Sequence, residues 1–238
     1  MLERLARDAA ASFVLTDTGR ILRENDPDRS AGPRLAMLGC ANGNLAFVRH
    51  DVPDGVAAPL LEEVSKNAPW FETDTLPTCA KALAEWLAPV TSVEPSLVFA
   101  LPHAAPAADA RIVRSGTGEG DALLAGLARD GMPAHLVEAG FIGLGDFWAP
   151  WCVLLDGGEI AAMAFAARLG EAAAEVGVYT FPNWRACGFA AAVTAAWAGL
   201  PELEDLELFY SCLASNRSSR RVAARLKLQH IGMRLRIT

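Results

Sequence analysis

The chain has 238 residues, of which 52% are hydrophobic and 21% are charged, and these proportions exclude a wholly disordered protein. Its net charge of −7 argues against general nucleic-acid binding, which needs an excess of bases. The longest uncharged run, residues 186–201, is too short to span a membrane, and the first residues lack the apolar core of a secretion signal. Five scattered cysteines, with no pair at metal-binding spacing, predict a cytoplasmic protein with reduced thiols and no metal site.

The first half of the chain contains short strand patterns and two helical patterns. Helical spacing of apolar residues occurs in 56–66 and 79–87. Alternation and turn residues, among them the Asn42-Gly43 pair, predict strands at 12–15, 20–22, 35–38, 45–48 and 96–101. Residues 101–108 are rich in proline and alanine, which is typical of a linker. We therefore expect a smaller α+β module over residues 1–105, whose role the sequence does not identify.

Residues 109–238 have a more regular order of elements. The helices are expected at 121–129, 134–139, 187–198 and 216–226. The strands are expected at 111–114, 152–155, 160–167, 175–180, 206–212 and 231–237. Central hairpins followed by helical crossovers predict an α/β domain, with a mixed sheet flanked by helices.

The segment between the strand at 175–180 and the next helix carries the clearest chemical signal. Arg185, Gly188 and Ala190 follow a strand and Pro182, and small residues stand where the helix begins. Unpaired N–H groups and the helix dipole make such a helix start a binding site for phosphate groups. The lysine and hydroxyl of a nucleotide triphosphatase loop are missing, and no G-x-G-x-x-G spacing occurs. What remains is an R-x-x-G-x-A pattern.

This R-x-x-G-x-A pattern resembles the coenzyme A pyrophosphate loop of the GNAT superfamily of N-acetyltransferases. Downstream, residues 215–228 resemble the family's N-x-x-[AS]-x-x-[VL]-x-x-x-L-G-F segment, in the expected order after a helix and a strand. The resemblance covers residues 110–238. The E-V-G-V-Y-T strand and the additional first half resemble the subgroup near the zwittermicin-resistance acetyltransferases. Lys227 stands where the family has glycine, so the turn there must be made differently.

The resemblance implies direct transfer of an acetyl group from acetyl-CoA, as co-substrate, to a primary amine of a small molecule or peptide. It implies no metal, nucleic-acid or membrane partner, and a homodimer is compatible with it. The Val178 N–H is the first choice for the thioester oxygen, and Asn216 for a contact with the pantetheine arm. The residues expected to bind the coenzyme are Val178, Tyr179, Thr180, Arg185, Ala186, Cys187, Gly188, Phe189, Ala190, Asn216 and Ser219.

Glu175 is the first choice for the general base. Strand alternation places it on one face with Gly177, which is expected to leave open space for the acceptor. The alternative is a structural carboxylate that is solvated or paired with Arg168. Many family members carry a tyrosine where this chain has Ala223, and there it protonates the departing thiolate. Tyr210 is the candidate catalytic residue to replace that phenol, with Ser211 as another candidate. Protonation by water or unaided departure of the thiolate is the favoured alternative.

Two other functions remain open at this point. The absence of a tyrosine at Ala223 suits a degenerate protein that binds acyl-CoA without turnover. The unassigned first half suits an interaction module in which the acetyltransferase-like half is only a scaffold.

Overall fold

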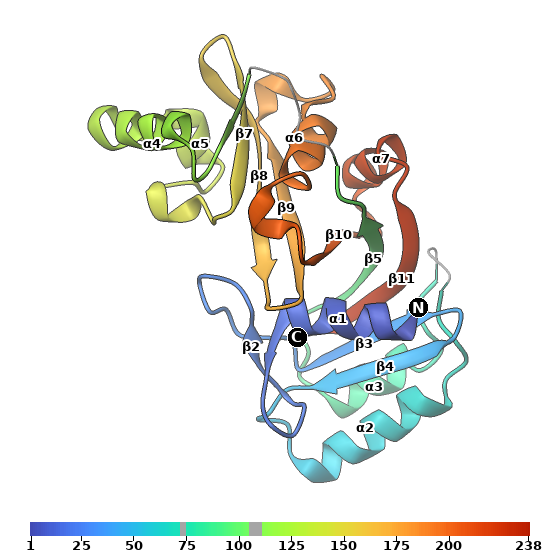
Figure 1. The fold of residues 1–238 in the computed structure, drawn as a ribbon. Coiled ribbons are helices and arrows are strands. Elements are labelled where there is room, and N and C mark those ends of the chain that lie inside the picture. The colour runs from blue at the N-terminus through green and yellow to red at the C-terminus, as the bar shows by residue number, and fades with distance from the viewer. Residues whose placement is uncertain (72–74, 105–110) are drawn as a thin grey trace.

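The computed structural model describes residues 1–71, 75–104 and 111–238, and a nine-stranded mixed sheet runs through it in the order β4-β3-β11-β5-β10-β9-β8-β7-β6 (Figure 1). Its strands are β3 Leu35–Cys40, β4 Gly43–Val48, β5 Val93–Leu101, β6 Ile112–Arg114, β7 Trp151–Asp156, β8 Glu159–Leu169, β9 Ala173–Thr180, β10 Glu207–Leu213 and β11 Gln229–Ile237. A separate hairpin pairs β1 Phe13–Leu15 with β2 Ile21–Glu24.

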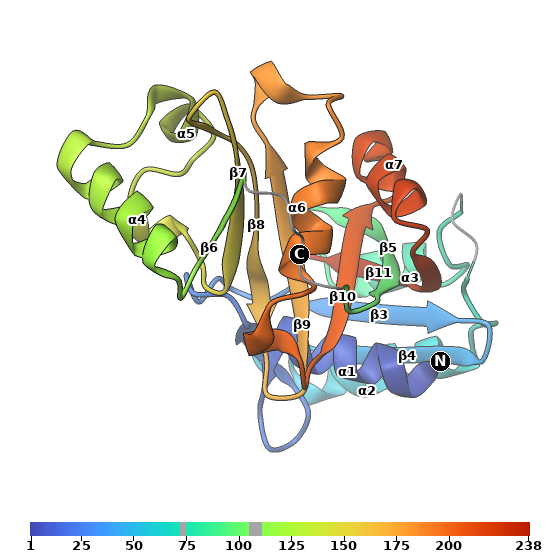
Figure 2. The same ribbon diagram turned by 45° about the horizontal axis from the view of Figure 1, so that its top comes forward.

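Helices cover both faces of this sheet (Figure 2). They are α1 Leu2–Ser12, α2 Asp54–Lys66, α3 Ala80–Trp86, α4 Gly118–Asp130, α5 Ala134–Glu138, α6 Phe189–Trp197 and α7 Arg217–Arg225. Short 3₁₀ turns occupy Leu144–Asp146, Pro182–Trp184 and Pro201–Leu203. The predicted fold class is confirmed: the chain is a mixed α/β protein with a large sheet flanked by helices.

Side chains that alternate along the strands build a separate core on each face. Met37 belongs to a core cluster that includes residues of α2, α3, α6 and α7, whereas its neighbour Leu38 belongs to a second cluster, with residues of α1. Val153 in β7 belongs to a third cluster, on the side of α4 and α5. Because both faces are buried, the strands are almost continuously apolar.

The sheet continues across the expected boundary between the two halves. β5 lies between β10 and β11, and β3 joins the sheet through β11, so strands from both halves share one core. The expected linker, residues 101–108, is described only as far as residue 104, and the remainder lies outside the described residues.

Helix α1 was not expected from the sequence. Leu5 and Ala9 lie one turn apart on the face of α1 that is buried against the sheet. The helix lies across the sheet near β9, β11 and β3 (Figure 1). It therefore brings the first residues of the chain next to the strands of the second half. Among the helices of the described residues, none is long and apolar enough to cross a membrane.

Candidate functional site

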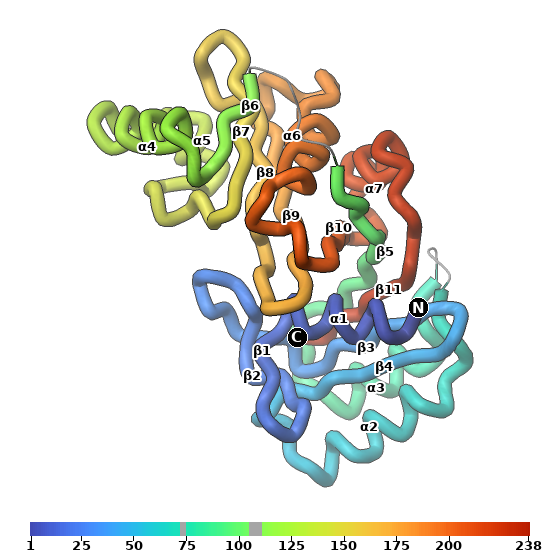
Figure 3. The backbone as a smooth tube through the Cα atoms, in the orientation of Figure 1, coloured from blue at the N-terminus to red at the C-terminus, as the bar shows by residue number. Residues whose placement is uncertain are grey.

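Strands β9 and β10 run side by side only at their beginnings (Figure 3). Their parallel pairing covers residues 173–175 of β9 and 207–209 of β10 and ends at the pair Glu175 and Phe209. Beyond that pair, β9 stays bonded to β8 and β10 stays bonded to β5. We call the opening between the two strands beyond Glu175 and Phe209 the fork.

Backbone groups of β9 face the fork without a strand partner on that side. The Phe181 N–H donates to the Ala161 carbonyl oxygen across the β8–β9 pair, at 3.1 Å. In an antiparallel ladder the direction of the N–H groups alternates, so the Val178 and Thr180 N–H groups point away from β8. They therefore point into the fork, in agreement with the role expected for Val178.

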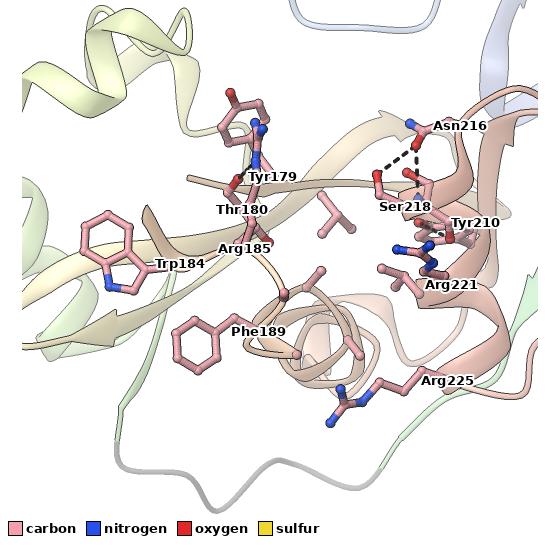
Figure 4. A pocket seen from close by; sticks show the side chains of 17 residues that line it. Tyr179, Thr180, Trp184, Arg185, Phe189, Tyr210, Asn216, Ser218, Arg221 and Arg225 are labelled. Carbon is pink, nitrogen blue, oxygen red and sulfur yellow. Dashed lines mark hydrogen bonds between the residues drawn. The ribbon is translucent and has the colours of Figure 1, made fainter. Parts of the chain in front are cut away.

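A cavity of about 750 Å³ opens at the fork. Residues of β9 and the loop after it form one wall, and residues of β10 and α7 form the other (Figure 4). Of the residues expected to bind the coenzyme, Cys187 alone is absent from the lining, and its side chain is exposed. The lining consists of Val178, Tyr179, Thr180, Trp184, Arg185, Ala186, Gly188, Phe189, Ala190, Ala191, Tyr210, Asn216, Ser218, Ser219, Arg221, Val222 and Arg225.

The loop before α6 turns sharply at the mouth of this cavity. Ala186 and Gly188 have φ angles of 66° and 84°, in the left-handed region. These angles delay the start of α6 to Phe189, two residues later than the sequence predicted. The N–H groups in the first turn of a helix have no intrahelical acceptor, and here that turn lines the cavity. The loop therefore presents backbone donors to any ligand that lies there.

The opposite wall is positively charged. Arg221 and Arg225 stand one turn apart on α7 and both line the cavity. Within the described ranges, neither guanidinium group takes part in a hydrogen bond or an ion pair. Neither residue is among those expected to bind the coenzyme, although their i, i+4 spacing places them on one helix face. Two cations beside the helix start favour an anion at this place.

Asn216 and Ser219 form the N-terminal cap of α7. The Asn216 side-chain oxygen accepts a hydrogen bond from the Ser219 N–H at 3.1 Å, which caps the helix. It also accepts the Ser218 hydroxyl at 2.9 Å. The Asn216 amide nitrogen has no hydrogen-bond partner within the described part of the chain, so its N–H groups are free for a ligand. The Thr180 hydroxyl is likewise buried and unpartnered there.

Tyr210 brings a phenol to the same wall. Its hydroxyl donates to the Ser219 carbonyl oxygen at 3.2 Å. Burial raises the pKa of Tyr210 to about 12, so the phenol stays protonated at neutral pH. Ala223 lies on the next turn of α7 after Ser219 and is buried. A hydroxyl from β10 therefore lies beside α7, the helix on which the family carries its own tyrosine.

Glu175 lies outside the cavity lining, on the other face of β9. The Ser211 hydroxyl donates to one carboxylate oxygen of Glu175 at 2.8 Å, and Arg234 donates to the other at 2.7 Å. Burial alone would raise the pKa of Glu175, but the charge and hydrogen bond of Arg234, with smaller contributions from Arg168 and Ser211, together hold that pKa below its usual value. The alternative pairing with Arg168 is wrong, because the guanidinium of Arg168 bonds to Glu24 instead.

The open space expected beside Gly177 is also absent. A Cβ atom at Gly177 would lie 2.5 Å from the ring of Phe165, its partner across the β8–β9 pair. The glycine therefore makes room for an aromatic ring of the protein. That expectation was wrong because the sequence could not show which residue of β8 lies opposite Gly177.

Lys227 takes the backbone conformation of the glycine that it replaces. Its φ angle is 54°, and its N–H donates to the Ala224 carbonyl oxygen at 3.1 Å. The Leu228 N–H donates to the Ala223 carbonyl oxygen at 3.0 Å, which completes a Schellman ending for α7. The expectation of a different turn was therefore wrong: the geometry is kept, with a side chain at a left-handed position.

No protein-family model and no curated protein matches the chain. Solved structures with a similar fold include a GCN5-related N-acetyltransferase-like protein from Streptococcus suis, with 15% identity, full coverage of both chains and a TM-score of 0.45. A GCN5-related N-acetyltransferase from Sphaerobacter thermophilus has 17% identity, covers 100% of this chain and 84% of its own, and has a TM-score of 0.44.

A protein assigned to the GNAT family from Novosphingobium aromaticivorans has 24% identity and a TM-score of 0.44. It matches 62% of this chain, and the chain covers 65% of its length, slightly less than two thirds. At these identities the likeness concerns the fold. Within the described ranges, no three His, Cys, Asp or Glu side chains gather into a group that could hold a metal ion.

Proposed function

We propose that the protein transfers an acetyl group from acetyl-CoA to a primary amine of a small molecule or peptide. One observation carries this proposal: unpaired N–H groups of β9 and the first turn of α6 open onto the same cavity. The first feature suits an amide-rich arm that ends in a thioester, and the second suits a pyrophosphate. Acetyl-CoA carries both groups, joined through pantetheine.

The pyrophosphate would lie at the loop before α6. The N–H groups of residues 186–190 face it there, and the positive φ angles of Ala186 and Gly188 let the backbone come close. Arg225 and Arg221 supply two positive charges that have no acidic partner within the described residues. A ligand with phosphate groups would neutralise them.

The pantetheine arm would run along the fork toward the Val178 N–H. There it would take the place of the missing strand partner of β9, while the free amide of Asn216 contacts it from the α7 wall. Aimed at the thioester oxygen, the Val178 N–H would stabilise the negative charge that develops during attack. The same site would hold the reactants in a fixed orientation.

The reaction needs one base and one acid. The amine nitrogen attacks the carbonyl carbon, the carbon–sulfur bond breaks, and sulfur leaves with the bonding electron pair. Tyr210 would give its proton to that sulfur and then recover one from solvent. Glu175 would accept the proton of the amine. Because Tyr210 and Ser211 are adjacent in β10, they point to opposite faces of the sheet. We therefore propose that the coenzyme enters on the Tyr210 face and the acceptor on the Glu175 face.

The five free cysteines support placing this reaction in the reducing cytoplasm. A release assay for free CoA thiol over a panel of primary amines tests the function, with mass spectrometry of the product as confirmation. The expected result is thiol release that depends on one class of amine. Tight binding of acetyl-CoA without release on any amine would identify a binding protein. Absence of both would leave the fold as a scaffold for interactions.

A further inference from the structure

A buried cluster of charges joins helix α1 to the fork. Arg234 of β11 contacts the carboxylate of Asp8 in α1 at 2.6 and 2.7 Å and that of Glu175 at 2.7 Å. The side chains of Arg234, Asp8 and Glu175 are 5%, 0% and 12% exposed. Ser211 extends the chain of contacts to β10 through its bond to Glu175. We call Asp8, Arg234, Glu175 and Ser211 the carboxylate cluster.

The charges of the carboxylate cluster do not balance. Two carboxylates share one guanidinium group, so the cluster carries one net negative charge when both are ionised. A buried charge in excess is costly, and neutralising Arg234 requires only one of the two carboxylates. The excess charge lies at the end of the paired part of β9 and β10, where the proposed reaction needs a proton acceptor.

We propose that Asp8 is a positioning residue for acetyl transfer: acting through Arg234, it fixes the Glu175 carboxylate at the fork and strengthens it as a base. This inference rests on the function proposed above. The negative charge of Asp8 favours protonation of Glu175. Because Arg234 is shared between the two carboxylates, its attraction for Glu175 is also weaker. The first helix of the chain would thus belong to the catalytic site of the second half.

Charged groups on the neighbouring elements change the pKa of Asp8. Burial raises the pKa of Asp8 to about 6; Arg234 opposes this effect, whereas Glu175 and Glu207 of β10 add to it. Glu207 is itself paired with Arg4 of α1, and also with Arg7, and Arg168 of β8 acts on Glu175. Below about pH 6 a proton on Asp8 removes the excess charge, and Glu175 is then the only ionised carboxylate paired with Arg234. Glu175 then becomes a weaker base.

The test is the pH dependence of turnover in the intact Asp8→Asn protein. We expect the maximal kcat to fall by about tenfold, as a weakened base would produce, with the KM for acetyl-CoA changed by less than about twofold. The wild-type enzyme should lose activity in a step near pH 6, and that step should vanish in Asp8→Asn. The Glu3→Gln protein is the matched control, because it removes an exposed ion pair of α1, with Arg7, outside the carboxylate cluster. It should keep both kcat and the step.

An active Asp8→Asn protein with wild-type kcat and an unchanged step would overturn the inference and leave the proposed function standing. A wild-type protein that releases no thiol would instead overturn the proposed function. If Asp8→Asn does not fold, carboxyl ¹³C NMR of the wild-type protein decides. An aspartate should titrate near pH 6, and Glu175→Gln should lower its pKa by removing a like charge. If no aspartate titrates between about pH 5 and 7, the inference is contradicted.

Discussion

The guanidinium group of Arg225 lies directly against Gly188: a Cβ atom added to Gly188 would be 2.6 Å from Arg225 Nη1. The end of α7 and the loop before α6 therefore meet at the place where we propose that pyrophosphate binds. The positive φ of Gly188 and the neighbouring cation both favour a residue without a side chain. This contact links the two motifs that the sequence analysis had connected only through family resemblance.

Gly188→Glu should weaken the binding of acetyl-CoA by more than about tenfold, or about 1.4 kcal/mol. The new side chain adds bulk at the loop and a carboxylate that would pair with Arg225 in place of a phosphate. Isothermal titration measures the loss. Gly131→Glu is the matched control, because Gly131 also has a positive φ, of 87°, and lies outside the cavity lining. A folded Gly188→Glu protein with wild-type affinity would exclude the loop as the pyrophosphate site.

Tyr210→Phe should lower kcat by about 10²-fold, the usual contribution of a positioned acid, and leave the affinity for acetyl-CoA nearly unchanged. Burial raises the pKa of Tyr210 to about 12, so the phenol itself should cause no loss of activity up to about pH 10. The chain has two tyrosines, and both line the cavity, so Tyr179→Phe tests whether the loss of any phenol there lowers kcat; it should not. The Tyr179 ring packs edge-on against Phe141 and Phe181. Normal turnover in Tyr210→Phe would show either that water protonates the thiolate or that the thiolate leaves without an acid.

Lys227→Gly should raise the free energy of unfolding by about 1 kcal/mol, because glycine adopts the left-handed conformation at little cost. Urea denaturation measures the difference. Lys227→Ala separates the backbone effect from the loss of charge, since alanine keeps the Cβ atom and should be no more stable than the wild type. Equal gains in both variants would mean that the charge of Lys227, and not its φ angle, is the unfavourable feature.

Gly177→Ala should lower the free energy of unfolding by about 1–3 kcal/mol, the usual cost of overpacking. The added methyl group would lie 2.5 and 2.6 Å from two atoms of the Phe165 ring. Phe165→Leu in the same protein should recover part of the loss by giving the methyl group room. If Gly177→Ala is as stable as the wild type, the ring can move aside, and the space beside Gly177 is available to a ligand after all.

The local elements of the site were predictable because their signals are local. The strand at β9, the proline-bounded loop and the small residues at the start of α6 all follow one another in the chain. Helix α7 was found because Asn216 is a good cap and the helical spacing after it is regular. Within the described ranges, nine of the eleven strands share one sheet. That arrangement could not be read from the sequence, because pairings such as that of β5 with β10 join residues far apart in the chain.

The partner of Glu175 and the space beside Gly177 were misjudged for the same reason. The environment of Glu175 depends on Asp8 and Arg234, which come from the two ends of the chain. Gly177 depends on the register of β8 against β9. Helix α1 was missed although its apolar residues, Leu5 and Ala9 among them, lie on one face that packs against the sheet. For Glu175 and Gly177 the deciding contact is a tertiary one.

A crystal structure with acetyl-CoA bound tests the central claim most directly. We predict the pyrophosphate at the N–H groups of residues 186–190 beside Arg225, and the thioester oxygen within hydrogen-bond distance of the Val178 N–H. The sulfur should lie within reach of the Tyr210 hydroxyl, which would then turn from the Ser219 carbonyl oxygen toward it. A coenzyme bound away from the fork, or lying in it with the thioester far from both Val178 and Tyr210, would contradict the account.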